Sequence, residues 1–196
     1  DIKAVVCVHI YGLPANITEI EKICAPKGIK IVEDGAQAAG GFYENGKPIG
    51  SSNNLTTFSF YVTKNLAAFG DAGGILCQDD KLSEEIISIR NHGRSPDGHK
   101  LIGRNSRCDH LQAAVLDLKL ATIEQQSIDR KTAAAWYFDE LKGIAGVELV
   151  PEKYIKISSW HLFPIRLENK EKKQALREYL GSKNIGSAPF YEKAMP

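Results

Sequence analysis

The stretch of sequence that decides the fold is AVVCVHIYGLPANITEIEKICAPKGIKIVED, residues 4–34. It opens with a continuous apolar, β-branched run at 4–8, which is typical of a strand covered on both faces. Apolar residues then recur at helical spacing over 17–24, and a second apolar strand follows at 29–32. Strand, helix and strand within about thirty residues form a βαβ unit, so the sequence predicts a parallel sheet.

The rest of the chain continues this pattern and then changes. A helix with a buried stripe of Leu82, Ile86 and Ile89 is expected after the sheet. Other elements are expected as strands over 55–62, 75–77 and 160–167, and as helices over 109–126, 129–142 and 170–180. We therefore predict an α/β fold, with a mostly parallel sheet flanked by helices and a smaller C-terminal α+β domain. Residues 1–127 would belong to the large domain and residues 128–196 to the small one.

Composition argues against several classes of protein. The chain has 196 residues, 43% hydrophobic and 25% charged, which is an ordinary soluble globular profile. Its net charge is +1, so nothing calls for nucleic acid or an acidic membrane as a partner. No apolar run is long enough to span a bilayer, and no secretory signal opens the chain. We expect a cytoplasmic protein.

The four cysteines do not point to a metal site. None stands at C-x-x-C spacing, and no histidine follows one at the spacing of a zinc site. We interpret them as reduced structural thiols and predict no metal. The chain also begins at Asp1 without a methionine and enters a strand almost at once, so we expect it to be part of a longer protein.

Residues able to carry chemistry follow the predicted strands. Asp34 ends one strand, Ser59 to Lys64 end the next, and the glycines of 70–74 shape the loop behind it. In open parallel sheets, ligands bind beyond the carboxyl ends of the strands, so these residues are candidates for one site. Taken singly, each has a structural explanation: a turn-capping aspartate, a solvated lysine and a glycine turn.

Four motifs in order make the case stronger. The run FSFYVTKNLAAFGDAGG at 58–74 resembles the lysine-bearing segment of the DegT/DnrJ/EryC1/StrS family of sugar aminotransferases. Upstream, VEDGAQAAGG at 32–41 is similar to the acidic cofactor motif of that family. Downstream, NHGR at 91–94, and GRNSR at 103–107 followed by LQAA, match two further signatures. The resemblance covers essentially the whole chain and implies the large domain of a fold-type I transferase that depends on pyridoxal 5'-phosphate (PLP).

The resemblance implies a role for each of five residues. Lys64 lies where the family's lysine forms a Schiff base with PLP, and Asp34 where a carboxylate pairs with the pyridinium nitrogen. Gln37 matches a side chain against the cofactor ring near its phenolic oxygen, and Ser59 a hydroxyl that binds the phosphate. Asn105 matches a residue that reaches the phosphate from the other subunit, which implies a homodimer.

The implied activity is transamination by a ping-pong mechanism. An amino acid donor, expected to be glutamate, would supply the amine, and a keto-sugar nucleotide would receive it. One alternative is a PLP-dependent sugar dehydratase, which Lys64 disfavours because those relatives carry histidine there. Another is a non-catalytic fragment without cofactor, because the family's Gly-Thr phosphate turn and its ring-stacking aromatic residue have no counterpart in this sequence.

Four further residues stay outside the predicted site. By analogy with the family, His161 and Tyr191 are candidates for substrate contact, although we favour a structural role for His161 within a strand. Arg94 and Arg107 are candidates for binding a substrate phosphate, and salt bridges that hold loops explain them equally well.

Overall fold

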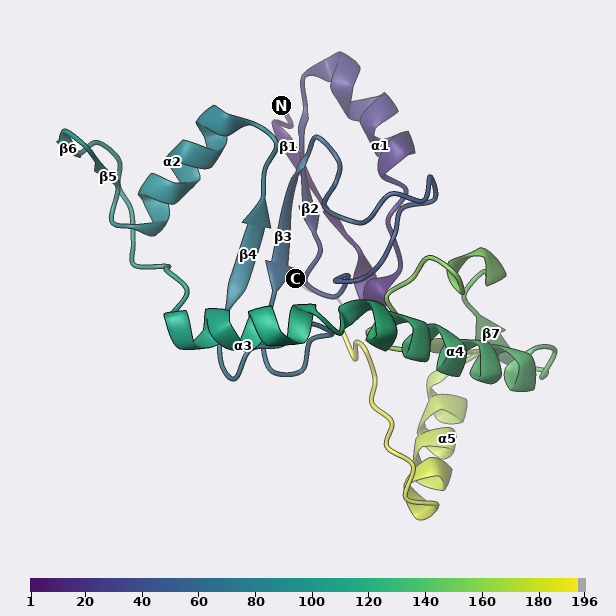
Figure 1. The fold of residues 1–196 in the computed structure, drawn as a ribbon. Helices are drawn as coiled ribbons and strands as arrows, with labels where there is room; N and C mark the ends of the chain where they lie inside the picture. The colour runs from purple at the N-terminus through teal and green to yellow at the C-terminus, as the bar shows by residue number, and fades with distance from the viewer. Residues whose placement is uncertain (194–196) are drawn as a thin grey trace.

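The fold centres on a four-stranded sheet (Figure 1). This computed structural model describes residues 1–193. The strands lie in the order β1 (Ala4–Val8), β2 (Lys30–Asp34), β3 (Leu55–Ser59) and β4 (Gly73–Leu76). The first three are parallel, and β4 runs antiparallel to β3. The predicted α/β fold with a mostly parallel sheet is therefore confirmed.

One face of the sheet is covered by α1 (Ile17–Cys24), which connects β1 to β2. The Asn16 side chain caps this helix by accepting a hydrogen bond from the Glu19 N–H at 3.3 Å. Short 3₁₀ turns at Ile10–Gly12 and Ala25–Lys27 flank it. The buried core lies between this helix and the sheet, and its members are Cys7, Ile17, Cys24, Ile31, Ala38, Tyr43 and Ile49.

The opposite face of the sheet is open. Side chains alternate along a strand, so Val6 and Val8 point away from the core that holds Cys7. They are 64% and 46% exposed, and Ile75 on β4 is 48% exposed. Asp34 pairs with Val8 and therefore lies on this face, opposite the core.

The remaining elements surround the sheet (Figure 1). The long helix α4 (Ile123–Leu141) follows α3 (His110–Leu120) after a short break. The arm at the far side of α2 carries a two-stranded hairpin. The other bounds are α2 (Asp80–Arg90), β5 (Arg94–Ser95), β6 (Gly98–His99), β7 (Val147–Leu149), the 3₁₀ turn Glu152–Tyr154, β8 (Ile165–Leu167) and α5 (Lys170–Ser182).

Two predicted strands are shorter than expected. The strand predicted over 55–62 ends at Ser59, because the chain turns there and the Lys64 N–H bonds to the Tyr61 carbonyl at 2.8 Å. The strand predicted over 160–167 begins only at Ile165. Trp160 has a positive φ of 46°, and its carbonyl accepts from Arg130 at 3.1 Å, so the backbone there cannot join a ladder.

Two helix predictions were also wrong in detail. The helix predicted over 109–126 breaks after Leu120, where the Thr122 hydroxyl donates to the Lys119 carbonyl at 2.9 Å. The predicted stripe on α2 is not buried: Leu82 and Ile89 are exposed, and no residue of that helix is buried. A stripe of apolar residues predicts a helix face that packs, but the partner must come from elsewhere in the fold.

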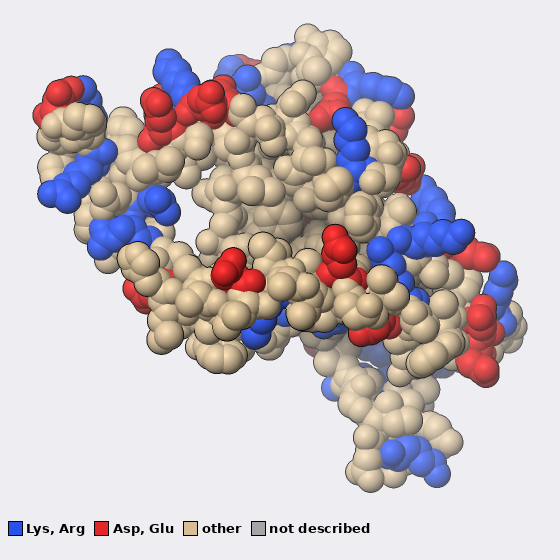
Figure 2. All heavy atoms as spheres, in the orientation of Figure 1, with Lys and Arg blue, Asp and Glu red and all other residues tan. Residues whose placement is uncertain are grey.

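The proposed division into two domains stays a prediction. The helix α4 crosses the boundary at 127 and 128 without interruption. The four cysteines are free thiols, Cys7 and Cys24 within the core. Among the helices of residues 1–193, none combines the length and the hydropathy that a membrane crossing requires. Figure 2 shows charged side chains of both signs spread over the face in view, which agrees with the net charge of +1.

Candidate active site

Asp34 occupies the last position of β2, between the ends of two neighbouring strands. Its carbonyl accepts the His9 N–H at 3.0 Å, and the next N–H, that of Gly35, donates to the Thr57 carbonyl at 2.8 Å. One carboxylate oxygen accepts the Ala36 N–H at 2.9 Å. The other oxygen has no hydrogen-bond partner within residues 1–193, so it is available to a cationic N–H.

Ser59 lies at the end of β3 on the same face as Asp34. Asp34 pairs with Thr57, and Ser59 is two residues further along the same strand. The Ser59 hydroxyl oxygen accepts the Tyr61 N–H at 3.4 Å. Within residues 1–193 the hydroxyl hydrogen makes no hydrogen bond, so it can donate to an anion.

Lys64 lies in a loop that folds back onto the end of β3. The loop is closed by the Ala68 N–H, which donates to the Phe60 carbonyl at 2.7 Å. Lys64 itself is half-buried, and the residue after it, Asn65, is buried. The Lys64 amine makes no hydrogen bond or ion pair to any residue that the structure describes, so its lone pair or proton is not committed elsewhere.

Gln37 is held by three distant parts of the chain. Its side-chain oxygen accepts the Tyr11 N–H at 2.5 Å, and its amide nitrogen donates to the Tyr191 hydroxyl at 3.4 Å. The Gln37 carbonyl accepts the Ser159 hydroxyl at 2.9 Å. The Ser159 hydroxyl can come this close only because residue 12 is glycine. A Cβ there would lie 2.3 Å from the Ser159 oxygen, and the residue has a φ of +90°.

His161 joins the site although we predicted it to be a structural residue of a strand. It lies outside any strand, with Nδ1 3.2 Å from the Asn65 side-chain oxygen. Asn65 donates its amide to the Ser159 carbonyl at 2.8 Å, so its oxygen is an acceptor and His161 Nδ1 carries the proton. Burial, and then the charges of Lys64 and Arg130, lower the pKa of the imidazole. These effects favour the neutral imidazole, whose Nε2 can then act as an acceptor.

This arrangement predicts how His161 titrates. Lys64→Met removes a positive charge beside the imidazole, so the pKa of His161 should rise relative to the unaltered protein. A pH titration of the histidine signals by NMR measures the change. Lys81→Met, a change at an exposed lysine of α2, is the matched control and should leave the signal of His161 in place. If the pKa of His161 does not change in Lys64→Met, the charge of Lys64 does not act on the imidazole.

Asn105 does not join the other four predicted residues. It is exposed, lies between β6 and α3, and pairs with Asn91 in an isolated bridge. Arg107 donates to the Asn91 side-chain oxygen at 2.5 Å, which agrees with a loop-holding role. Asn105 lies apart from the other predicted residues of its own chain, as a residue that contacts the cofactor of a partner subunit would. Its role stays a prediction.

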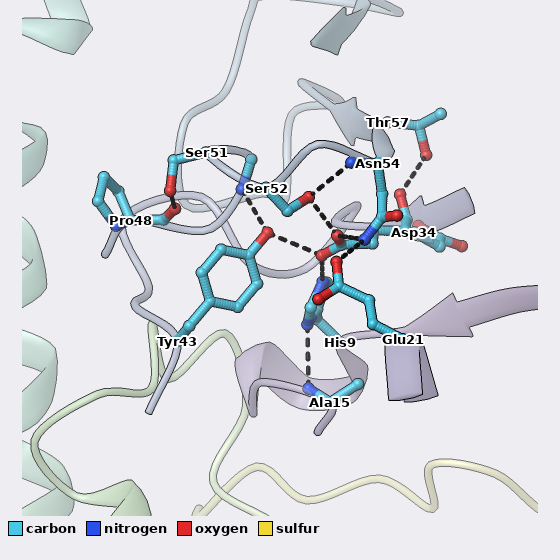
Figure 3. Close-up of polar contacts among 12 residues, drawn as sticks. His9, Ala15, Glu21, Asp34, Tyr43, Pro48, Ser51, Ser52, Asn54 and Thr57 are labelled. Carbon is cyan, nitrogen blue, oxygen red and sulfur yellow. Dashed lines mark hydrogen bonds and ion pairs between the residues drawn. The ribbon is translucent and has the colours of Figure 1, made fainter. Parts of the chain in front are cut away.

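A buried carboxylate next to the site escaped the sequence analysis. Glu33 is fully buried on the covered face and accepts four hydrogen bonds, from His9, Tyr43, Ser52 and Asn54. Burial alone would raise the pKa of this carboxyl, but the four hydrogen bonds together lower it to about 2. Figure 3 shows the donors His9, Tyr43, Ser52 and Asn54 converging on one centre. No sequence signal identified Glu33, because its donors come from separate segments.

Glu33 predicts a loss of stability in acid. Its pKa is lowered from 4.5 to about 2 on folding, so its contribution is fully present above pH 4.5 and disappears as the pH falls toward 2. The shift corresponds to about 3 kcal/mol of unfolding free energy. Urea unfolding of the unaltered protein and Glu33→Gln between pH 7 and pH 2.5 should show a difference in stability that narrows with acid. A difference in unfolding free energy that stays the same from pH 7 to pH 2.5 would contradict this prediction.

The comparisons with known proteins agree with the motifs. The sequence profile of the DegT/DnrJ/EryC1/StrS aminotransferase family matches residues 1–196. The chain belongs to this family. It is 37% identical over 190 residues to the dTDP-3-amino-3,4,6-trideoxy-alpha-D-glucose transaminase of Streptomyces venezuelae, an alignment that covers 96% of this chain and 49% of the relative. The chain thus spans about half the length of the curated relatives it matches.

Two solved structures show the same fold. The crystal structure of S. venezuelae DesV in complex with a ketimine intermediate is 37% identical, with a TM-score of 0.85 over 94% of this chain and 49% of that one. NtdA of Bacillus subtilis with the bound cofactor PMP is 28% identical, with a TM-score of 0.81 over 92% of this chain and 41% of that one. The predicted fold-type I class is therefore confirmed, and PLP is the cofactor of the family.

The free groups of the site fit PLP. An acceptor at Asp34 matches the protonated ring nitrogen, a donor at Ser59 the phosphate and an uncommitted amine at Lys64 the aldehyde. No cluster of three or more histidine, cysteine or acidic side chains suited to a metal occurs within residues 1–193.

Proposed function

We propose that the protein of which this chain forms part is a PLP-dependent aminotransferase that converts a keto-sugar nucleotide to an amino-sugar nucleotide. The observation that supports the proposal is the position of Asp34 and Ser59 at the carboxyl ends of β2 and β3, with Gln37 and Lys64 in the loops that follow these strands. Asp34 and Ser59 share the open face of the sheet. A chain of hydrogen bonds through Ser159 connects the residue after Lys64 to Gln37.

Each side chain has a defined task in such a reaction. Bound PLP supplies an electrophilic carbonyl for amines and a ring that takes up an electron pair. The Asp34 carboxylate holds the proton on the ring nitrogen, and a neutral asparagine would not, because it lacks the charge. The Ser59 hydroxyl donates to the phosphate and orients the ring. The Lys64 amine would hold the cofactor through its aldehyde and, when free, would move a proton to and from the substrate carbon.

Lysine at position 64 favours transamination over dehydration, since the dehydratases of the family carry histidine there. We propose glutamate as the donor, a ping-pong order of substrates, and a homodimer in which Asn105 reaches the phosphate bound by the partner subunit. The dTDP-sugar named for the S. venezuelae relative suggests a nucleotide-activated sugar as acceptor. The cytoplasmic location expected from the sequence stays a prediction.

The full-length protein tests this proposal. Incubated with PLP, ¹⁵N-glutamate and a panel of dTDP- and UDP-linked keto-sugars, it should transfer ¹⁵N to at least one sugar, as detected by mass spectrometry. A sugar that loses water without gaining ¹⁵N would identify a dehydratase instead. A full-length protein that takes up no PLP would leave only the non-catalytic alternative.

A further inference from the structure

The reaction proposed above makes no use of Glu33, although this is the most completely buried acid of the described chain. Glu33 is adjacent to Asp34 on β2, and consecutive side chains of a strand point to opposite faces. The carboxylate of Glu33 is therefore inside the core, and that of Asp34 is on the open face. Any constraint on Glu33 acts on the backbone that also carries Asp34.

The four donors to Glu33 come from three segments. His9 Nε2 and the Tyr43 hydroxyl donate to one oxygen, at 2.9 and 2.8 Å. Ser52 and Asn54 donate to the other, at 2.5 and 2.9 Å. His9 directly follows β1, Tyr43 lies in the loop after β2, and Ser52 and Asn54 directly precede β3. The carboxylate thus joins the three parallel strands near the site (Figure 3).

All four donors are neutral. The Ala15 N–H donates to His9 Nδ1 at 3.0 Å, so the single ring proton of His9 is on Nε2 and points at Glu33. Burial raises the pKa of the Tyr43 phenol, and the Gly50 N–H donates to its oxygen, so the phenol keeps its proton. A buried charge that has only neutral donors depends on all of them, because each unsatisfied oxygen is costly there.

The segments that bind Glu33 also make backbone hydrogen bonds to the residues of the candidate site. The His9 N–H donates to the Asp34 carbonyl. Two residues after His9, the Tyr11 N–H donates to the side-chain oxygen of Gln37. On the other side, the Gly35 N–H bonds to β3 at Thr57. A displacement of β1 relative to β2 would therefore disturb both the Asp34 backbone and the contact to Gln37, and a displacement of β3 would disturb the backbone at Gly35.

We propose that Glu33 is a positioning residue for Asp34: from the covered face it holds the carboxyl end of β1 and the beginning of β3 against β2, so that the Asp34 carboxylate meets the ring nitrogen of PLP. The inference rests on the proposed function, since it assumes that Asp34 binds that nitrogen. It assigns Glu33 no contact with cofactor or substrate.

Comparing the binding of two cofactors distinguishes a positioning role of Glu33 from a general effect on stability. PLP and its 1-deaza analogue, in which carbon replaces the ring nitrogen, both present an aldehyde to Lys64 and a phosphate to Ser59, but only PLP can pair with Asp34. Dissociation constants are measured by fluorescence titration of the full-length protein. Glu33→Gln should weaken PLP binding about tenfold and leave the 1-deaza analogue within about twofold. Asp34→Asn provides the reference for complete loss of the preference.

Further variants guard against misfolding and general effects. Tyr43→Phe removes one donor and keeps the aromatic ring in the core, so it should lower the preference for PLP in the same direction as Glu33→Gln. Tyr43→Phe decides the question if Glu33→Gln does not fold. Ser127→Ala removes a buried hydroxyl that donates to the Gly40 carbonyl at 3.0 Å, away from Asp34, and should leave the preference unchanged.

The contrary outcomes are distinct from one another. If Glu33→Gln and Tyr43→Phe weaken the binding of both cofactors equally, or of neither, the positioning role is wrong and the proposed function is unaffected. An unaltered protein that binds both cofactors equally would refute the pairing with Asp34, and the inference with it. An unaltered protein that binds neither cofactor would refute the proposed function itself.

Discussion

Lys64→Ala is expected to reduce transamination by roughly three orders of magnitude or more, because it removes the amine that binds the cofactor and transfers the proton. The loop that carries Lys64 should survive, since its closing hydrogen bonds are made by backbone atoms of Tyr61, Phe60 and Ala68. Borohydride reduction followed by peptide mass spectrometry should find a phosphopyridoxyl group on residue 64 of the unaltered protein and none in the variant. The rate of ¹⁵N transfer from glutamate measures the loss of activity.

A matched control shows that the loss is specific to position 64. Lys81→Ala removes an exposed lysine of α2 and should keep both the label at Lys64 and the rate. Labelling at another lysine in Lys64→Ala, with activity retained, would assign the nucleophile elsewhere. The pKa of His161 should rise in Lys64→Ala, as in Lys64→Met, and stay unchanged in Lys81→Ala.

Asp34→Asn should slow the half-reaction with glutamate by roughly 10² to 10⁴-fold, because proton transfer at the substrate carbon depends on a protonated ring nitrogen. The substitution keeps the shape of the side chain, and the asparagine oxygen can still accept the Ala36 N–H as Asp34 does. The effect should therefore be electronic rather than structural. Stopped-flow absorbance after mixing the PLP-loaded protein with glutamate measures the rate.

Asp79→Asn is the control for this change of charge. Asp79 caps α2 by accepting the Leu82 N–H at 3.0 Å, and asparagine caps helices about as well as aspartate. The control should keep the rate of the unaltered protein. If Asp34→Asn were as fast as the control, the ring nitrogen would not need a carboxylate, and the role assigned to Asp34 would be wrong.

The sequence predicted the sheet well because the signals are local. Apolar runs at 4–8 and 29–32 became β1 and β2 to within one or two residues, and the helix between them formed where the isoleucines recur. The rule that ligands bind beyond the carboxyl ends of parallel strands then selected Asp34, Ser59 and Lys64. The structure brings these residues to one edge of the sheet, and their roles await the experiments above.

Predictions of packing were less successful, because a pattern does not name its partner. The apolar stripe of α2 forms a helix as expected but remains exposed in this chain. The segment around Trp160 and His161 has the composition of a strand, yet hydrogen bonds from Asn65 and Arg130 hold its backbone out of any sheet. The donors of those bonds lie far away in the sequence.

By itself, the sequence determined the order of strands and helices and the residues that follow β2 and β3. These depend on periodicity and turn chemistry, which act over a few neighbouring residues. The family resemblance came from four short motifs. Only the tertiary structure decided that His161 contacts Asn65, the residue after Lys64, and that Glu33 connects three strands on the face opposite Asp34. Those contacts connect residues that are 10 to 96 positions apart, and hydrogen bonds between such groups follow from the folded path of the chain.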